Sequence, residues 1–421
     1  MLPALSVTIW VVSRIGLVTP RYKPSPCRSL IGAAGWWNHI DMTTRPIALF
    51  DMAAQQALIR DKLDARIAAV LSSGRFINGP EVTELETRLA EFAGCNHAVG
   101  VSSGTDALQI AMMAEGIGRG DAVFLPAFTY TATAEVPLVL GATPIFCDVD
   151  PVTFNMDLDD LKRRIALVEA EGRLRPRAVV GVDLFGRPAD WAAIEAICAA
   201  HGMFALDDAA QAFGGDIGGR RLGCFGAATA LSFYPTKTLG CYGDGGALLT
   251  QDAERAALYR SLRTHGEGGG RYEVLRTGMN GRLDTLQAAI LLCKMDLFAD
   301  ELAARAKVAG WYAQHLAGTV ALPEIVPGHA WGLYTVKLED GAARARMQDA
   351  LRAASIPFGV YYPKPLHHQP AYAAAHASGI GQAPPLPGSE ALCDQVMSLP
   401  MHPYLDEGDV ARVAAAVRAT L

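Results

Sequence analysis

The sequence lacks the features that mark several classes of protein. No stretch reaches the about 20 consecutive apolar residues of a membrane-spanning helix. Basic residues are not in excess, because 37 lysines and arginines stand against 43 acidic residues and leave a formal net charge of -6. We therefore expect no nucleic-acid partner and no membrane insertion. A content of 51% hydrophobic and 19% charged residues excludes a disordered composition.

The cysteines show no pattern that would indicate a metal site or a redox motif. There is no Cys-x-x-Cys pair and no neighbouring histidine at metal-ligand spacing, so we expect no metal. Scattered cysteines of this kind are typical of reduced, mostly buried thiols in a cytoplasmic protein. The eight are Cys27, Cys95, Cys147, Cys198, Cys224, Cys241, Cys293 and Cys393.

The N-terminal segment differs in composition from the rest of the chain. A short apolar run, Ala4 to Val12, is followed by basic residues and prolines. A secretory signal would carry its charges before the apolar run, so the order argues against one. We expect residues 1–42 to be a disordered extension, or the product of an upstream start codon with Met42 as the true first residue.

From Ile47 onward, short apolar runs alternate with helical patterns, and this alternation favours an α/β fold with a mainly parallel sheet. The chain is long enough for two domains. We expect a large domain over 43–295 and a smaller α/β domain over 296–421. Helical periodicity over 283–314 leads from the first to the second, where a strand over 333–338 and a helix over 342–354 are predicted. The strands predicted for the large domain are 98–101, 122–125, 143–147, 178–182, 203–206, 228–233 and 246–250.

One lysine stands in a setting suited to covalent catalysis. Lys237 follows the strand predicted at 228–233 and precedes a glycine-rich run over 240–246. Asp207 and Asp208 end an earlier strand, and Gln211 follows three residues later. Pyridoxal phosphate needs a lysine for its aldehyde and an acid for its pyridinium nitrogen. Side-chain alternation along a strand turns only one of the two acids toward the site, and the pattern leaves the choice between them open.

Two further segments could hold the same cofactor. Ser102–Asp106 joins a strand to a helix, where helix amides, Gly104 and the Thr105 hydroxyl would bind a phosphate. Taken alone, this segment is more often an ordinary helix cap. Tyr130 follows another strand, and a flat ring there could stack on a pyridine, although an aromatic at a strand end is usually core packing.

Other motifs carry weaker signals. The glycine pairs Gly214-Gly215 and Gly218-Gly219 match no phosphate-loop spacing and predict a hairpin turn. His265, Arg263 and Arg282 are candidate substrate contacts, although each is by default a surface or structural residue. If the substrate bears a carboxylate, an arginine would bind it. The candidates for that role are Arg263, Arg271, Arg276 and Arg282.

Several motifs in order resemble the DegT/DnrJ/EryC1/StrS sugar aminotransferases, which are pyridoxal-phosphate enzymes of fold type I. The resemblance begins near Ile47, covers most of the chain and depends on the motifs together, since any one would be weak. The matching segments are Gly79–Val82, Ser103–Leu108, Pro126–Ala134, Asp208–Gln211, Ser232–Lys237, Asn280–Ala289 and Tyr362–Leu366.

The resemblance implies a role for each matched position. Lys237 corresponds to the lysine that carries the cofactor, Asp208 to the partner of the ring nitrogen and Gln211 to the contact of the ring hydroxyl. Asn280 corresponds to an asparagine that reaches the phosphate from the neighbouring subunit, which implies a homodimer with shared active sites. The remaining matches are Gly104, Thr105 and Ser232 for the phosphate and Tyr130 for stacking on the ring.

Within the family, the chain is most similar to UDP-2-acetamido-2-deoxy-3-oxo-glucuronate aminotransferases of lipopolysaccharide O-antigen synthesis. The shared stretches include Leu239–Gly246, Arg282–Leu292 and Met397–Tyr404. Near the expected sugar site, Tyr361 stands where that subgroup tends to carry histidine, and His367 replaces a different polar residue. These two and Tyr362 are therefore candidate substrate contacts, and the exact sugar stays open.

The expected reaction is a two-step transamination. An amino acid, expected to be glutamate, leaves its nitrogen on the cofactor, and a keto-sugar nucleotide then takes it up while Lys237 moves the proton. One alternative is a related sugar dehydratase, but such relatives carry histidine in place of the lysine. A regulatory protein on the same scaffold is a second alternative, and it predicts loss of residues that are present here. A nicotinamide dehydrogenase would need a Gly-x-Gly-x-x-Gly turn, which is missing.

Overall fold

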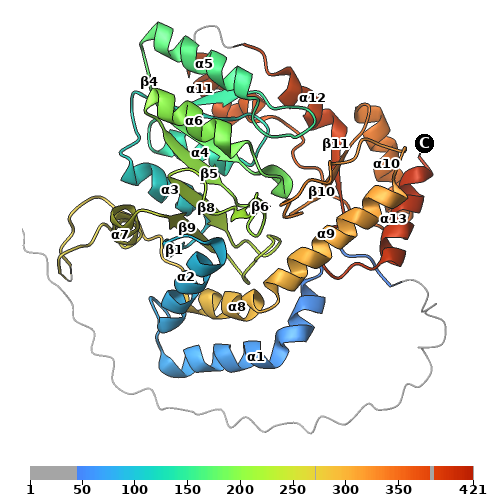
Figure 1. Ribbon diagram of the computed structural model, residues 1–421, viewed down its shortest axis with the longest axis horizontal. Coiled ribbons are helices and arrows are strands. Elements are labelled where there is room, and N and C mark those ends of the chain that lie inside the picture. The colour runs from blue at the N-terminus through green and yellow to red at the C-terminus, as the bar shows by residue number, and fades with distance from the viewer. Residues whose placement is uncertain (1–44, 271, 380–383, 421) are drawn as a thin grey trace, which may run out of the picture. The chain divides into compact units, whose positions relative to one another are not determined.

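The computed structural model describes residues 45–270, 272–379 and 384–420. The described residues from Pro46 onward form one compact unit, and Figure 1 draws them in colour. The N-terminal extension expected over residues 1–42 lies outside the described residues. No helix among those that are described is long and apolar enough to cross a membrane.

A seven-stranded sheet forms the centre of the molecule and confirms the predicted fold class. Six strands run parallel to one another, and only β9 runs in the opposite direction, between β1 and β8. Every strand predicted for the large domain is present within a few residues. In spatial order the strands are β1 (His97–Val101), β9 (Gly246–Thr250), β8 (Ala228–Ser232), β5 (Phe204–Asp208), β4 (Arg175–Val182), β2 (Asp121–Pro126) and β3 (Thr143–Cys147).

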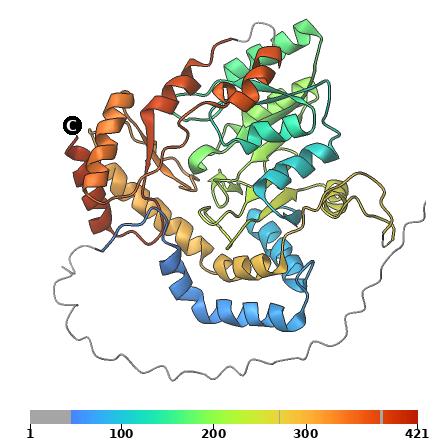
Figure 2. The same cartoon turned by 180° about the vertical axis from the view of Figure 1, so that it is seen from behind.

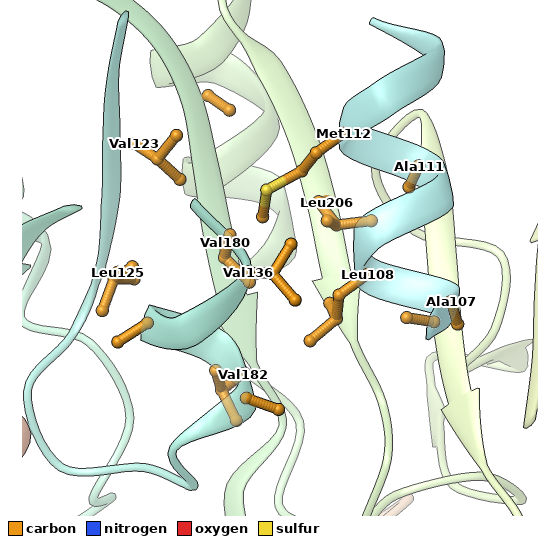
Figure 3. Close-up of a cluster of buried hydrophobic side chains, with 14 of the residues drawn as sticks. Ala107, Leu108, Ala111, Met112, Val123, Leu125, Val136, Val180, Val182 and Leu206 are labelled. Atoms are coloured by element: carbon orange, nitrogen blue, oxygen red, sulfur yellow. The ribbon is translucent and has the colours of Figure 1, made fainter. Parts of the chain in front are cut away.

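Helices cover both faces of this sheet, because successive side chains of each strand point to opposite sides. On β2, Val123 and Leu125 pack against one set of helices, whereas Phe124 packs against the other set. Figure 3 shows Leu108 and Met112 of one helix lying over the strands on the first face. The helices on that face are α3 (Gly104–Ala114), α4 (Ala132–Val139) and α7 (Ala253–Leu262), and those on the other are α2 (Pro80–Ala93), α5 (Leu158–Glu171), α6 (Trp191–His201) and α8 (Thr285–Met295).

The C-terminal part has a small sheet and a hydrophobic core of its own. In it, β10 (Tyr334–Lys337) pairs antiparallel with β11 (Val396–Leu399). Their buried side chains pack with α9 (Phe298–His315), α10 (Gly341–Ala353) and α13 (Glu407–Arg418). Figure 2 shows these elements from behind. A division into domains at residue 295 stays a prediction.

The remaining elements complete the unit. The predicted hairpin is confirmed, since β6 (Asp216–Ile217) pairs antiparallel with β7 (Arg220–Arg221). The helical segment predicted over 283–314 consists of two helices, because α8 ends at Met295 and α9 begins at Phe298. The other elements are α1 (Met52–Ser73), α11 (Pro370–Gly379), α12 (Pro387–Gln395) and the short 3-10 helices η1 (Leu184–Gly186) and η2 (Leu366–His368).

The expectation of reduced cysteines is wrong for one pair. Cys95 and Cys224 form a disulfide, with their Cα atoms 5.8 Å apart. Their separation of 129 positions in the sequence explains why no local spacing indicated the pairing. Five other cysteines are free and buried, as expected.

The packing of the sheet against α3 generates a prediction about stability. Leu206 of β5 is completely buried, so Leu206→Ala leaves a cavity and should lower the free energy of unfolding by about 3 kcal/mol. Leu58 on α1 is 64% exposed, and the same change there should cost no more than about 0.5 kcal/mol. Urea unfolding of both variants measures the difference, and equal losses would contradict the assigned core.

Candidate active site

The candidate site lies where β5 and β8 end at the carboxyl edge of the sheet, the usual place for a ligand in such a fold. Asp208 points to the same face of the sheet as Leu206, two residues earlier on β5. The Leu206 side chain packs against α3 and α4 on that face. The Asp208 carboxylate accepts a hydrogen bond from the Thr133 hydroxyl of α4 at 3.0 Å and one from the Ala210 N–H at 3.3 Å. Asp207 points to the opposite face and accepts from the Thr229 hydroxyl at 3.1 Å. The structure thus turns Asp208 toward the site and Asp207 away from it.

Lys237 lies opposite Asp208 on the loop that follows β8. The loop is folded back on itself, since the Lys237 N–H donates to the Tyr234 carbonyl at 2.9 Å. Burial lowers the pKa of Lys237, and the nearby Asp208 carboxylate opposes this shift without cancelling it. Burial likewise raises the pKa of Asp208, against the effect of its two donors and of Lys237. The site therefore favours a neutral, nucleophilic amine more than water would.

The glycine-rich run after Lys237 is held by a buried lysine that sequence reasoning missed. The Lys294 ammonium of α8 donates to the Gly240 carbonyl at 2.6 Å and lies 4.2 Å from the centre of the Tyr242 ring. Burial lowers the pKa of Lys294 to about 8. Lys294 lies in the predicted helix with nothing to distinguish it, so only the tertiary contact reveals its role.

A cradle for an anion lies at the N-terminus of α3. The Ser103 hydroxyl caps this helix by accepting from the Asp106 N–H at 3.0 Å, as the sequence allowed. A Cβ added to Gly104 would come within 2.8 Å of the Ser232 Cβ, so the end of β8 closely approaches the helix terminus. Glycine, helix amides and the Thr105 and Ser232 hydroxyls suit a phosphate group. The predicted phosphate residues are thus brought together from two distant segments.

Gln211 and two tyrosines form a further side of the site. The Gln211 side chain donates to the Tyr362 hydroxyl at 3.0 Å and accepts from the Phe185 N–H at 2.7 Å, so both of its ends are fixed. Tyr130 is 56% exposed, and its ring centre lies 6.3 Å from that of Tyr362. Tyr361 is half-buried beside them. The C-terminal part thereby contributes Tyr362 to the site.

The segment after α7 places two predicted residues on the surface. His265 and Asn280 are both exposed, and the backbone of Asn280 forms an isolated bridge with Thr264. This segment extends away from the sheet beyond α7, as Figures 1 and 2 show. No described contact joins either side chain to Lys237 within this single chain.

The other candidates differ in their contacts. Arg263 is engaged in an ion pair with Glu86, with 2.5 Å between Nη1 and Oε1. Arg276 donates to Ser261, whereas the buried Nε of Arg282 has no hydrogen-bond partner among the described residues. Arg271 is outside the described residues. His367 is 5% exposed and lies 3.2 Å from the Glu390 carboxylate of α12.

Known proteins resemble this chain over most of its length. It is 44% identical over 374 residues to the UDP-2-acetamido-2-deoxy-3-oxo-D-glucuronate aminotransferase of Pseudomonas aeruginosa, covering 88% of this chain and 99% of the relative. It is 40% identical over 379 residues to a UDP-N-acetyl-3-dehydro-alpha-D-glucosamine 3-aminotransferase of Acidithiobacillus ferrooxidans, covering 89% and 98% of the two chains.

Solved structures of known proteins also resemble this chain in fold. A DegT DnrJ EryC1 StrS aminotransferase from Brucella abortus superimposes with a TM-score of 0.85 at 45% identity, covering 89% of this chain and 99% of that one. NtdA from Bacillus subtilis, solved with bound cofactor PMP, gives a TM-score of 0.78 at 28% identity, with 88% and 83% covered. The model of the DegT/DnrJ/EryC1/StrS aminotransferase family matches residues 58–418. Because this match spans most of the chain and the Pseudomonas aeruginosa relative is 44% identical to it, the chain belongs to this family.

Proposed function

We propose that this aminotransferase uses pyridoxal phosphate to move an amino group from glutamate to a nucleotide-linked 3-keto sugar. The observation that carries the proposal is the placement of Lys237 opposite Asp208, whose carboxylate is fixed by Thr133 and Ala210. When bound, the cofactor supplies an aldehyde that condenses with amines and a ring that accepts electrons from the neighbouring carbon.

Each residue of the site has a distinct task toward that group. Lys237 would bind the aldehyde, and the Asp208 carboxylate would face the ring nitrogen and favour its protonated form. Gln211, oriented by Phe185 and Tyr362, donates to the ring hydroxyl. Gly104, Thr105 and Ser232 would hold the phosphate, and Tyr130 would pack against the ring.

Lys237 also transfers the proton. Once a substrate amine has replaced it, its side chain would be free at the same place, where burial lowers its pKa and so favours the neutral amine. A neutral amine can accept a proton from one carbon and return it to another. The lysine is thus both the attachment point and the base.

The substrate we propose is UDP-2-acetamido-2-deoxy-3-oxo-glucuronate or a close analogue. The aminated sugar would be used in O-antigen synthesis, and the reaction would take place in the cytoplasm. The Pseudomonas aeruginosa relative, a UDP-2-acetamido-2-deoxy-3-oxo-D-glucuronate aminotransferase, supports the choice of sugar. Arg282, whose Nε has no partner among the described residues, is the arginine best suited to bind the sugar carboxylate. Further contacts are proposed for His265, Tyr361, Tyr362 and His367.

We further propose a homodimer in which each subunit completes the site of the other. Asn280 stands on the exposed segment after α7, and the same segment exposes apolar side chains, namely Tyr272 at 75%, Val274 at 60% and Leu275 at 54%. Apolar side chains on an extended segment suit burial against a second subunit. Asn280 would then bind the phosphate of the partner's cofactor.

Replacing the lysine tests its two tasks together. Lys237→Ala should lower the rate of sugar amination by at least about 10³-fold, because both attachment and proton transfer are lost. Lys162→Ala on α5, a 59% exposed side chain, is the matched control and should leave the rate unchanged. Retention of more than a tenth of the activity by Lys237→Ala would contradict the assignment.

A comparison of two sugars tests the choice of substrate. The wild type should aminate the 3-keto sugar nucleotide with a C6 carboxylate at least about 100-fold more efficiently, by kcat/KM, than its analogue with a C6 hydroxyl. Arg282→Leu should remove most of this preference by slowing only the carboxylate sugar. Equal rates for the two sugars in the wild type would exclude the proposed substrate, while leaving aminotransfer itself intact.

Subunit mixing tests the shared site. Lys237→Ala and Asn280→Ala are each expected to be weakly active alone, but a heterodimer of the two contains one site with both native residues. Random mixing should restore about 25% of wild-type activity, since half of the dimers are mixed and half of their sites are native. If activity stays at the sum of the separate variants, the sites are self-contained.

A further inference from the structure

Three carboxyl groups are buried within a short distance of one another at the ends of β4 and β5. Asp183 and Asp207 are completely buried, and Asp208 is 6% exposed. Such groups are expensive to bury as ions, so each must be compensated by donors, by a cation or by a proton. Asp208 has Lys237 opposite it, which leaves Asp183 and Asp207 to be explained.

The hydrogen-bond partners of the two remaining acids are unequal. Asp183 accepts through Oδ1 from the Ala189 N–H at 2.7 Å and from the Trp191 indole N–H at 3.0 Å. Asp207 accepts through Oδ2 only from the Thr229 hydroxyl. The second oxygen of each acid, Asp183 Oδ2 and Asp207 Oδ1, is buried and has no donor from another described residue. Asp183 follows two residues after Gly181, the partner of Asp207 in the pairing of β4 with β5, and each of the two acids affects the pKa of the other.

Two carboxyl groups can form a hydrogen bond only if one of them carries a proton. The two N–H donors stabilise the ionised form of Asp183, whereas Asp207 has a single hydroxyl, so the proton belongs on Asp207 Oδ1 and is donated to Asp183 Oδ2. Burial raises the pKa of both acids, that of Asp183 to about 7. Burial and the adjacent acids raise the pKa of Asp207 well above its usual range, and its single hydroxyl donor makes it the member of the pair that keeps the proton. The charged group that acts on both members of the pair is the acidic Asp208, which raises the pKa of each.

The segment that begins with Asp183 contacts both residues proposed to face the cofactor ring. The Asp183 N–H donates to the Asp208 carbonyl at 3.2 Å. Two residues later, the Phe185 N–H fixes the Gln211 amide oxygen at 2.7 Å. Phe185 adopts the left-handed φ of 60°, and the Leu333 N–H holds its carbonyl at 3.1 Å. The end of β4 therefore connects Asp208, Gln211 and the chain leading to β10.

We propose that Asp183 and Asp207 share one proton and act as a positioning pair for Asp208 and Gln211. The hydrogen bond ties the ends of β4 and β5 together on the face away from the cofactor. The retained proton also halves the charge of the pair, so that Asp208 faces less repulsion from behind. This consequence rests on the proposed function, whereas the shared proton does not.

Infrared difference spectroscopy on the protein without cofactor tests the shared proton. At neutral pH, the difference between wild type and Asp207→Asn should contain the C=O stretch of a protonated carboxylic acid, lost in the variant and shifted by deuterium oxide. Asparagine keeps the shape and an N–H donor toward Asp183, so the variant should fold normally. Absence of the band would overturn the proposal, whatever the enzyme does.

Pyridoxal phosphate binding tests the positioning role. Asp207→Asn, which keeps the donor, should bind within about 2-fold of wild type, and Asp207→Ala, which loses it, should bind at least about 10-fold more weakly. Thermal unfolding by circular dichroism shows whether both variants are folded at the assay temperature. Equal affinity of the two folded variants would overturn the positioning role. If Asp207→Ala does not fold, Asp207→Asn decides the positioning role, because a loss of affinity well beyond about 2-fold in a variant that keeps the donor would overturn it. Failure of the wild type to bind the cofactor would refute the proposed function and leave the infrared result valid.

Discussion

The burial of Asp208 opposite Lys237 is the constraint on which the rest of the site depends. A buried carboxylate and a buried amine each lose hydration, and neither is stable there without partners. The carboxylate accepts hydrogen bonds from the Thr133 hydroxyl and the Ala210 N–H. Lys294 stabilises the glycine-rich run after Lys237 by donating to the Gly240 carbonyl. The two donors oppose the rise in the pKa of Asp208 that burial causes, and burial lowers the pKa of Lys237 toward the neutral amine that attachment to an aldehyde requires.

The sheet and the helices beside it could be predicted well because each strand is a short apolar run ending at polar residues. The chemistry of Lys237, Asp208 and Gln211 could also be predicted, since strand ends of a parallel sheet meet at one edge. The alternation of side chains along a strand showed that only one of Asp207 and Asp208 faces the site. It did not show which of the two does. Deciding required the packing of Leu206 against α3 and α4, a contact between distant segments.

Other features had no local signal at all. Thr133 lay in a recognised motif without an assigned role, and its hydroxyl matters only because α4 crosses the end of β5. Asp183 resembled any polar residue after a strand until its neighbours were known. The disulfide joins residues 129 apart, and the break between α8 and α9 interrupts a periodicity that otherwise continues. Contacts made by a second subunit, as proposed for Asn280, leave no pattern in the sequence of one chain. The resemblance to the family implies them.

The central claim is that Lys237 and Asp208 equip the protein to take nitrogen from an amino acid before any sugar is present. The most direct measurement adds L-glutamate, without sugar nucleotide, to the protein loaded with pyridoxal phosphate, and follows the visible absorbance together with the release of the keto acid. The account predicts loss of the yellow absorbance and about one keto acid per active site, with neither change in Lys237→Ala. An unchanged spectrum with no keto acid released by the wild type would contradict it.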